Sequence, residues 1–392
     1  MKVHIRFKQD LTQFGIYLLI FSLFMILFCE PFGLSNILSL GVWMALIATI
    51  LVLIVAIAEE RIYKSPITLF TVLVLIISVF SIIISNQLSY KSIVSLISFL
   101  EIPLFVLSLN TISSEKIEKI IYRSFIIISI FLIILSFLPV AHIFENIYGV
   151  SYLDFLTLGY GNPNKTGMIL FGCFAVLISY INYEKKTIKK MFVLADTAYI
   201  FLMIIWTQSR VCIVISVLLI IFSFISNKNI IRIICNFCYI VPIVFAPIFI
   251  FFPKQLMQSN FMGETIDTGR LSIYMNVFNN LNIKNILIGN YAYQFGNLHN
   301  LYISVFATIG ILGVILFALL YFNILKKISC SYHSASNKIA LLAFSLFLLH
   351  SSVEAAMFLS GSSYAAIIIL LYILSINACN DNYHQRRLNN ND

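Results

Sequence analysis

Residues 65–85 read SPITLFTVLVLIISVFSIIIS, a run without any charged side chain in which every polar residue is Ser or Thr. A helix of about 20 apolar residues is long enough to cross the hydrocarbon core of a bilayer, which is about 30 Å thick. No water is available there to the backbone N–H and C=O groups, so a helix, which pairs them within the segment, is favoured. This run therefore predicts a transmembrane helix.

Similar runs cover most of the chain. Hydrophobic residues make up 60% of the 392 residues and charged residues only 10%, so water cannot be the main solvent of the folded chain. We therefore expect an all-α, polytopic integral membrane protein in which residues 1–392 form one transmembrane domain. Its twelve predicted spans are residues 12–29, 36–58, 65–85, 92–111, 120–141, 165–182, 190–206, 210–226, 229–252, 300–325, 339–357 and 361–379.

The Lys and Arg residues between the spans fall mainly on one side of the expected membrane. Because cytoplasmic loops are enriched in Lys and Arg, both termini are expected in the cytoplasm. The net charge of +9 follows from this topology and gives no indication of a nucleic-acid partner. Residues 1–10 form a basic tail that leads into a full-length span without a small-residue cleavage site, so no cleavable signal peptide is expected. Of the 25 Lys and Arg residues, six fall on the outer side: Lys91, Lys165, Arg210, Lys254, Arg270 and Lys284.

Two outer segments, residues 142–164 and 253–299, are long enough to carry chemistry. The first ends in Gly161-Asn162-Pro163-Asn164, and the second contains apolar residues at helical spacing after a start signal at residues 267–269. We expect a short amphipathic helix there, lying along the outer membrane surface. Its apolar positions are Leu271, Tyr274, Val277, Phe278 and Leu281.

Arg210 stands at the outer end of the eighth predicted span, directly after Thr207-Gln208-Ser209. One interpretation is that its side chain extends to lipid phosphates at the interface. The alternative is an anion clamp, because this side of the membrane carries few positive charges and the planar guanidinium pairs bidentately with phosphate oxygens. The sequence leaves both interpretations open.

Arg270 and His299 lie in the second outer segment. Arg270 opens the expected amphipathic helix, where the N-terminal N–H groups attract anions, although an ordinary solvated charge is an equal alternative. His299 adjoins the tenth span; it is either a structural residue or, as the one side chain of this segment that exchanges a proton near neutral pH, a general base.

Four acidic or histidine residues fall inside predicted spans and should face the interior of the bundle or a wet cavity. A proton relay and a structural pairing are both compatible with them, and they stay unassigned. No metal-binding or nucleotide-binding motif occurs in a plausible loop, so no cofactor is expected. The four residues are Glu101, Asp196, His350 and Glu354.

The order of these motifs resembles the superfamily of O-antigen ligases and Wzy-type polymerases of bacterial membranes, over residues 160–320. The resemblance rests on residues 161–164, on residues 207–210 at the start of a helix, on Gly269-Arg270, and on His299-Asn300 followed by Gly310 and Gly313. The individual motifs are short, and it is their order and their common outer side that make the match specific.

The resemblance implies a GT-C-like fold and a glycosyltransferase that uses undecaprenyl-diphosphate-linked oligosaccharide. Arg210 and Arg270 would hold the donor diphosphate and stabilise the charge that grows on it. His299 would take a proton from the acceptor hydroxyl in an inverting, metal-independent reaction. The resemblance further implies that substrate is bound by Asn162, Asn164, Ser209 and Asn300.

Within the superfamily, the Asn-Pro-Asn segment at residues 162–164 and the compact second outer loop favour a polymerase of O-antigen or capsular polysaccharide in the inner membrane. The alternative is a ligase that transfers glycan to lipid A-core. A chain-length regulator and a flippase would be its protein partners, beside the lipid bilayer. A transporter or flippase of lipid-linked sugars is a candidate from another class, but it should show related halves and polar sites at the midplane. A passive structural protein would have no reason to gather Arg210, Arg270 and His299 on one face.

Overall fold

The computed structural model describes residues 2–58, 66–89, 92–93, 96, 114–147, 150–251, 260–261, 264–265, 274, 276–277, 282–291, 298, 300–329 and 335–352. The α-helices in this part of the chain are α1 Lys2–Cys29, α2 Ser35–Ala58, α3 Pro66–Ile84, α5 Ser114–Ser136, α6 Pro163–Tyr183, α7 Thr187–Trp206, α8 Arg210–Ser223, α9 Lys228–Phe251, α12 Ile283–Ile288, α13 Leu301–Ser329 and α14 Ala335–His350. The short 3-10 helices are η1 Glu30–Phe32 and η3 Pro139–Ala141, and the strands are β1 His142–Ile147, β2 Val150–Leu156, β3 Asn260–Phe261 and β4 Glu264–Thr265.

The long helices overlap the predicted spans wherever the structure describes them. Residues 361–379 and nearly all of 92–111 lie outside the described residues. The described part of the chain is thus mainly helical, as an all-α membrane protein requires, whereas the count of twelve spans and the GT-C relation stay predictions. Within the described residues, the helices that are long and apolar enough to cross a membrane are the four stretches Pro66–Ile84, Lys119–Ser136, Pro163–Tyr183 and Leu301–Lys326.

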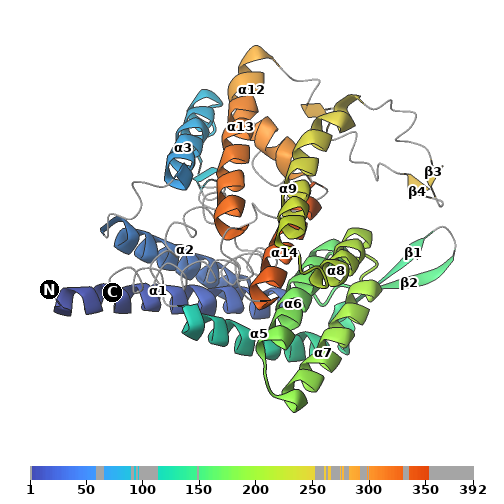
Figure 1. Cartoon of the computed structure of the whole chain (residues 1–392). Coiled ribbons are helices and arrows are strands. Elements are labelled where there is room, and N and C mark those ends of the chain that lie inside the picture. The colour runs from blue at the N-terminus through green and yellow to red at the C-terminus, as the bar shows by residue number, and fades with distance from the viewer. Residues whose placement is uncertain are drawn as a thin grey trace.

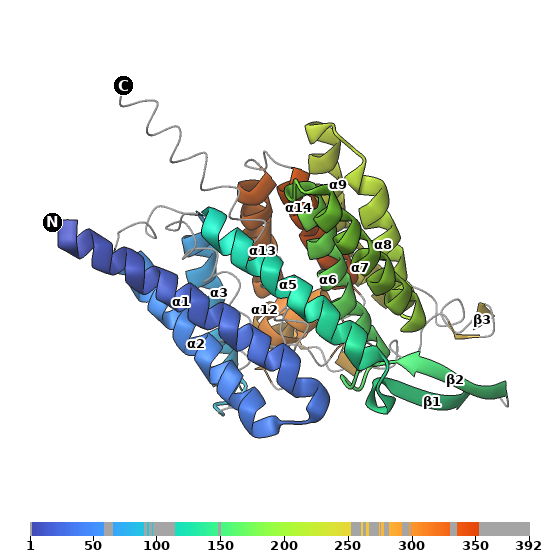
Figure 2. The ribbon, with the colours of Figure 1, turned by 90° about the horizontal axis from the view of Figure 1, so that it is seen from below.

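Helix α6 forms the centre of the bundle, and α5, α7, α8 and α14 pack around it. Its apolar stretch is 78% buried, more than that of the other three candidate spans. Figure 2 shows α1 and α2 as an antiparallel pair along one side of the bundle, inclined to α6 and α7. Aromatic contacts, among them Phe28 with Phe131, join α1 to α5.

Helix α13 is broken at Gly310, where the backbone has φ 70° and ψ −172°. A Cβ at this position would lie 2.4 Å from the carbonyl carbon of Leu287, and a Cβ at Gly289 would lie 2.4 Å from that of Thr308. Only glycine adopts this backbone conformation readily and allows such an approach. The two glycines therefore let the end of α12 dock on the break in α13. Figure 1 shows α12 directly beside α13.

Segment 142–164, which the sequence predicts on the outer side, contains an antiparallel β-hairpin that the all-α expectation did not include. Strands β1 and β2 pair from His142 opposite Leu156 to Ile147 opposite Val150. The segment is rich in Ile, Val, Phe and Tyr, which favour the pleated conformation when a partner strand lies close in sequence. Both views place this hairpin and the strands β3 and β4 on the same side of the molecule (Figures 1 and 2). Of the expected amphipathic helix, the structure describes Tyr274 and residues 276–277, which are helical, with Tyr274 and Val277 buried.

Candidate functional site

The first turn of α6 is fixed by Asn162 and Pro163. Asn162 has an extended backbone, and its side-chain oxygen accepts hydrogen bonds from the N–H groups of Asn164, at 2.8 Å, and Lys165, at 3.4 Å. Asn is a favoured N-cap, and Pro at the next position has no N–H group to leave unsatisfied. The predicted substrate-binding residue Asn162 is therefore a helix cap in this structure.

The turn between α7 and α8 places Ser209 and Arg210 beside the start of α6. Gln208 occupies the left-handed region with φ 57°, a conformation that costs a non-glycine residue free energy. The hydroxyl of Ser209 donates to the side-chain oxygen of Asn164 at 2.9 Å, and Ser209 makes no side-chain cap to α8. The first turns of α6 and α8 are thus joined directly by two of the residues that the sequence predicted.

Gly167 allows the close packing of α6 against α8. A Cβ at this position would lie 2.9 Å from Sγ of Cys212 and 3.0 Å from Cβ of Ser209. The thiol of Cys212 lies 3.9 Å from the carbonyl oxygen of Asn164, on the inner side of the Ser209 contact. A glycine one turn into α6 therefore sets the separation on which the bond between Ser209 and Asn164 depends.

Two cationic residues stand in these first turns. Arg210 is the first residue of α8 and is exposed. Lys165 forms an ion pair with Glu30 of η1, and both side chains are only 18% exposed. Glu30 balances the charge of Lys165 and Asn162 caps α6, so the attraction for an anion at this end comes from Arg210 and the positive end of the α8 dipole.

The start of α13 is linked to the same region through the end of α14. Asn300 caps α13 by accepting from the N–H groups of Tyr302 and Ile303, and its amide donates to the carbonyl of Ser352 at 2.6 Å. His350, at the end of α14, places Nε2 3.8 Å from Sγ of Cys212. A series of contacts therefore connects the N-terminal ends of three helices, α6, α8 and α13.

Among the predicted site residues, the structure brings Asn164, Ser209 and Arg210 together and connects Asn300 to them through α14. Arg270 and His299 lie outside the described residues, so their assignment to the site stays a prediction. Glu101 and Glu354 are outside as well.

Two of the ionisable residues predicted inside spans are described. Asp196 is buried between α7 and α5, where its Oδ2 accepts from the hydroxyl of Ser129 at 2.5 Å. His350 is 1% exposed and faces α8. Neither residue lies at the exposed end of the site, which fits positions in the helix packing rather than in substrate contact.

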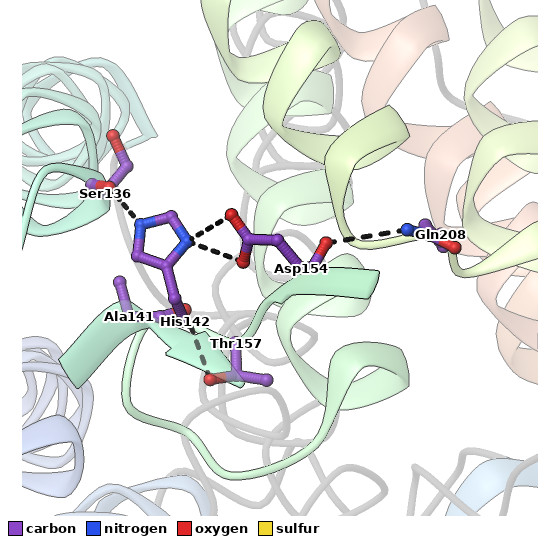
Figure 3. A network of polar contacts seen from close by, with 6 residues as sticks. All are labelled: Ser136, Ala141, His142, Asp154, Thr157 and Gln208. Atoms are coloured by element: carbon purple, nitrogen blue, oxygen red, sulfur yellow. Dashed lines mark hydrogen bonds and ion pairs between the residues drawn. The ribbon is translucent and has the colours of Figure 1, made fainter. Parts of the chain in front are cut away.

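Sequence reasoning missed the pair of His142 and Asp154 on the β-hairpin. Nδ1 of His142 lies 2.8 Å and 3.0 Å from the two carboxylate oxygens of Asp154, and Nε2 lies 2.9 Å from the carbonyl of Ser136 (Figure 3). The ring also packs on Trp206, and Gln208 donates to the carbonyl of Asp154 at 3.5 Å. The hairpin is thereby anchored to the end of α5 and to the turn that precedes Arg210.

Residues 157–161 also hold the site to the first helix pair. The hydroxyl of Tyr160 donates to the carbonyl of Leu27 at 3.0 Å, and a Cβ at Gly159, where φ is 78°, would meet the carbonyl of Pro31 at 2.8 Å. Burial raises the pKa of Tyr160 well above its usual value and so favours the protonated hydroxyl that donates this bond. The only local signal for these contacts is the glycine pair in residues 159–161.

Metal-ligating side chains do not gather in groups of three or more within the described residues. The expectation that the reaction needs no metal stays a prediction. No family model, curated protein or solved structure matches this chain. The expected resemblance to the polymerase and ligase superfamily therefore rests on the order of the motifs in the sequence alone.

Proposed function

We propose that this chain is a glycosyltransferase that polymerises undecaprenyl-diphosphate-linked oligosaccharide repeat units into O-antigen or capsular polysaccharide at the outer face of the bacterial plasma membrane. The observation that carries the proposal is the bond from Ser209 to Asn164, which joins the starts of α6 and α8 beside Arg210. Ser209 and Asn164 are 45 residues apart in the sequence, and both were predicted to bind the substrate. They are in contact.

The charges at this junction suit a diphosphate. Helix N-termini and the guanidinium of Arg210 attract phosphate oxygens, and a guanidinium can hold two of them at once. As the sugar–phosphate bond breaks, negative charge grows on the leaving diphosphate, and fixed positive groups then stabilise the transition state more than the ground state. Arg270 is the second guanidinium of the proposed clamp.

The acceptor side of the reaction is assigned to His299. Its neighbour in the chain, Asn300, caps α13 and is tied to the end of α14, and His350 of that helix reaches Cys212 on α8. A base attached to this junction would be carried by the same rigid helix ends that hold the donor diphosphate. Proton transfer from the acceptor hydroxyl to His299 would accompany attack on the anomeric carbon, with inversion of configuration.

The experiment uses purified full-length protein and a chemically defined undecaprenyl-diphosphate repeat unit, with products separated by size. A ladder of longer glycans supports the polymerase, and a single transfer to added lipid A-core would instead identify the ligase. Arg210→Ala should abolish the ladder, whereas Arg232→Ala, which removes an exposed arginine of α9, should preserve it. Absence of product with either acceptor, from protein that remains folded, would overturn the proposal.

A further inference from the structure

Among the buried Ser and Thr residues that the structure describes, two differ from the rest because their hydroxyls have no hydrogen-bond partner. In apolar helices Ser and Thr hydroxyls usually donate to a carbonyl three or four residues earlier. The buried residues that do so include Ser22, Thr49, Thr71, Ser78, Thr197, Ser216, Ser345 and Ser351. Within the described part of the chain, only Ser304 and Thr308 are buried Ser or Thr residues whose hydroxyls have no hydrogen-bond partner, and both are 0% exposed.

The two exceptions lie on the same face of α13, between its N-cap and its break. Residues four apart on a helix face the same side, with Cβ atoms about 5–6 Å apart. Asn300 lies one further turn toward the start of α13, so Ser304 and Thr308 continue a polar stripe that begins at the candidate site. The stripe ends at Gly310, where the backbone changes direction.

Two backbone carbonyl groups beside the break have hydrogen-bond partners, in contrast to these hydroxyls. The carbonyl of Thr308 accepts from the hydroxyl of Ser81 on α3 at 2.6 Å, and the carbonyl of Ala307 accepts from the N–H group of Asn290 at 2.7 Å. The helix discontinuity therefore leaves those carbonyls paired by protein groups. It is the side chains of Ser304 and Thr308, rather than the broken backbone, that need a partner.

We propose that Ser304 and Thr308 together bind an ordered water molecule inside the helix bundle. A buried hydroxyl without a partner is unfavourable, and buried water is the usual remedy where two or more polar groups converge. A water that makes two hydrogen bonds of about 2.8 Å fits between hydroxyls one helical turn apart. Two neutral hydroxyls suit a neutral ligand of this size better than an ion, which would need charged or more numerous partners.

The test compares Ser304→Ala, Thr308→Val and the double variant with Ser345→Ala and Thr71→Val, whose hydroxyls donate within their own helices. X-ray radiolysis converts bound water into hydroxyl radicals that oxidise adjacent side chains, and mass spectrometry measures oxidation of the peptide that covers residues 301–309. We expect oxidation of this peptide in the wild type and its loss in the double variant. The control variants should keep the wild-type level.

Thermal unfolding in detergent provides a second measurement with a predicted sign. If the water is bound, the single variants lose its hydrogen bonds and the apparent Tm should fall by about 1 °C or more. If the hydroxyls are buried without a ligand, their removal should raise the Tm, because an unfavourable group has been replaced by an apolar one of similar shape. A raised or unchanged Tm, or a wild-type peptide that is not oxidised above the level of the double variant, would overturn the proposal.

Discussion

Replacing Gly167 by Ala tests whether the approach of α6 to α8 sets the site. The new Cβ would lie 2.9 Å from Sγ of Cys212 and 3.0 Å from Cβ of Ser209, whereas nonbonded carbon atoms prefer about 3.5–4.0 Å. The helices must therefore separate by about 0.5 Å or more. Oγ of Ser209 and Oδ1 of Asn164 are 2.9 Å apart in the wild type. Moving the two helices apart would stretch this hydrogen bond toward the limit of a useful length.

The expected cost can be worked out from two opposing terms. Overpacking a buried contact costs about 1–3 kcal/mol, and Ala in place of Gly in a helix interior returns about 0.5–1 kcal/mol. We expect a net destabilisation of about 1 kcal/mol, which in a chain of 392 residues corresponds to a Tm lower by about 1–2 °C. Activity should fall further, by about 10-fold or more, because misplacing a binding group by a fraction of an ångström weakens the transition-state contacts.

Thermal unfolding in detergent and the glycan ladder measure the two effects separately. Gly41→Ala is the matched control, because its Cβ would crowd Cγ1 of Ile26 at 3.1 Å and the carbonyl oxygen of Ser22 at 3.3 Å in the α1 and α2 pair, so it should cost stability without moving α6 relative to α8. Adding Cys212→Ala to Gly167→Ala removes the nearest clashing atom and should restore part of the lost stability and activity. A Gly167→Ala variant with a raised Tm and full activity would refute the reasoning.

Three further predictions concern the orientation and the chemistry. A cysteine introduced beside Glu264 should react with an impermeant reagent from outside and one beside Lys186 should not; the reverse pattern would invert the topology. Arg210→Ala should abolish most glycan transfer at normal protein levels, with poor rescue by Lys, since an ammonium lacks the bidentate fork; near-normal activity of the Ala variant would make Arg210 an interfacial anchor. His299→Ala should reduce the transfer rate by about 100- to 10,000-fold while donor binding is retained; parallel loss of donor binding would make it a phosphate ligand or a structural residue.

The helices could be located from the sequence because a long apolar run indicates that the segment lies in the bilayer, where the backbone is expected to be helical. Residues 65–85 predicted α3, which begins at Pro66 and ends at Ile84. The hairpin of residues 142–156 was missed because a short alternating pattern gains stability only from a partner strand, and the sequence does not display the pairing. The start of α6 was readable in principle, since Asn followed by Pro is a typical helix beginning.

The candidate site could be predicted from the sequence only in part, because it also depends on contacts between distant segments. The order of the motifs gathered Asn164, Ser209 and Arg210 on one side, and the structure brings them into one junction. The pairing of His142 with Asp154, and that of Lys165 with Glu30, joins elements whose contact depends on how the helices pack. Such packing is decided by small residues such as Gly167, whose importance appears only once the facing helix is known.

The pairing of Lys165 also bears on the role of Arg270. Lys165 stands in the first turn of α6, but the carboxylate of Glu30 already balances its charge, so it adds little net attraction for an anion. A diphosphate linking a lipid to a sugar carries a negative charge on each phosphate, and helix N-termini supply only partial positive charges. Arg210 alone would therefore leave the donor incompletely neutralised when the leaving group gains charge. The proposed mechanism thus requires a second full positive charge at this junction, which is the reason to expect that Arg270, rather than Lys165, completes the clamp.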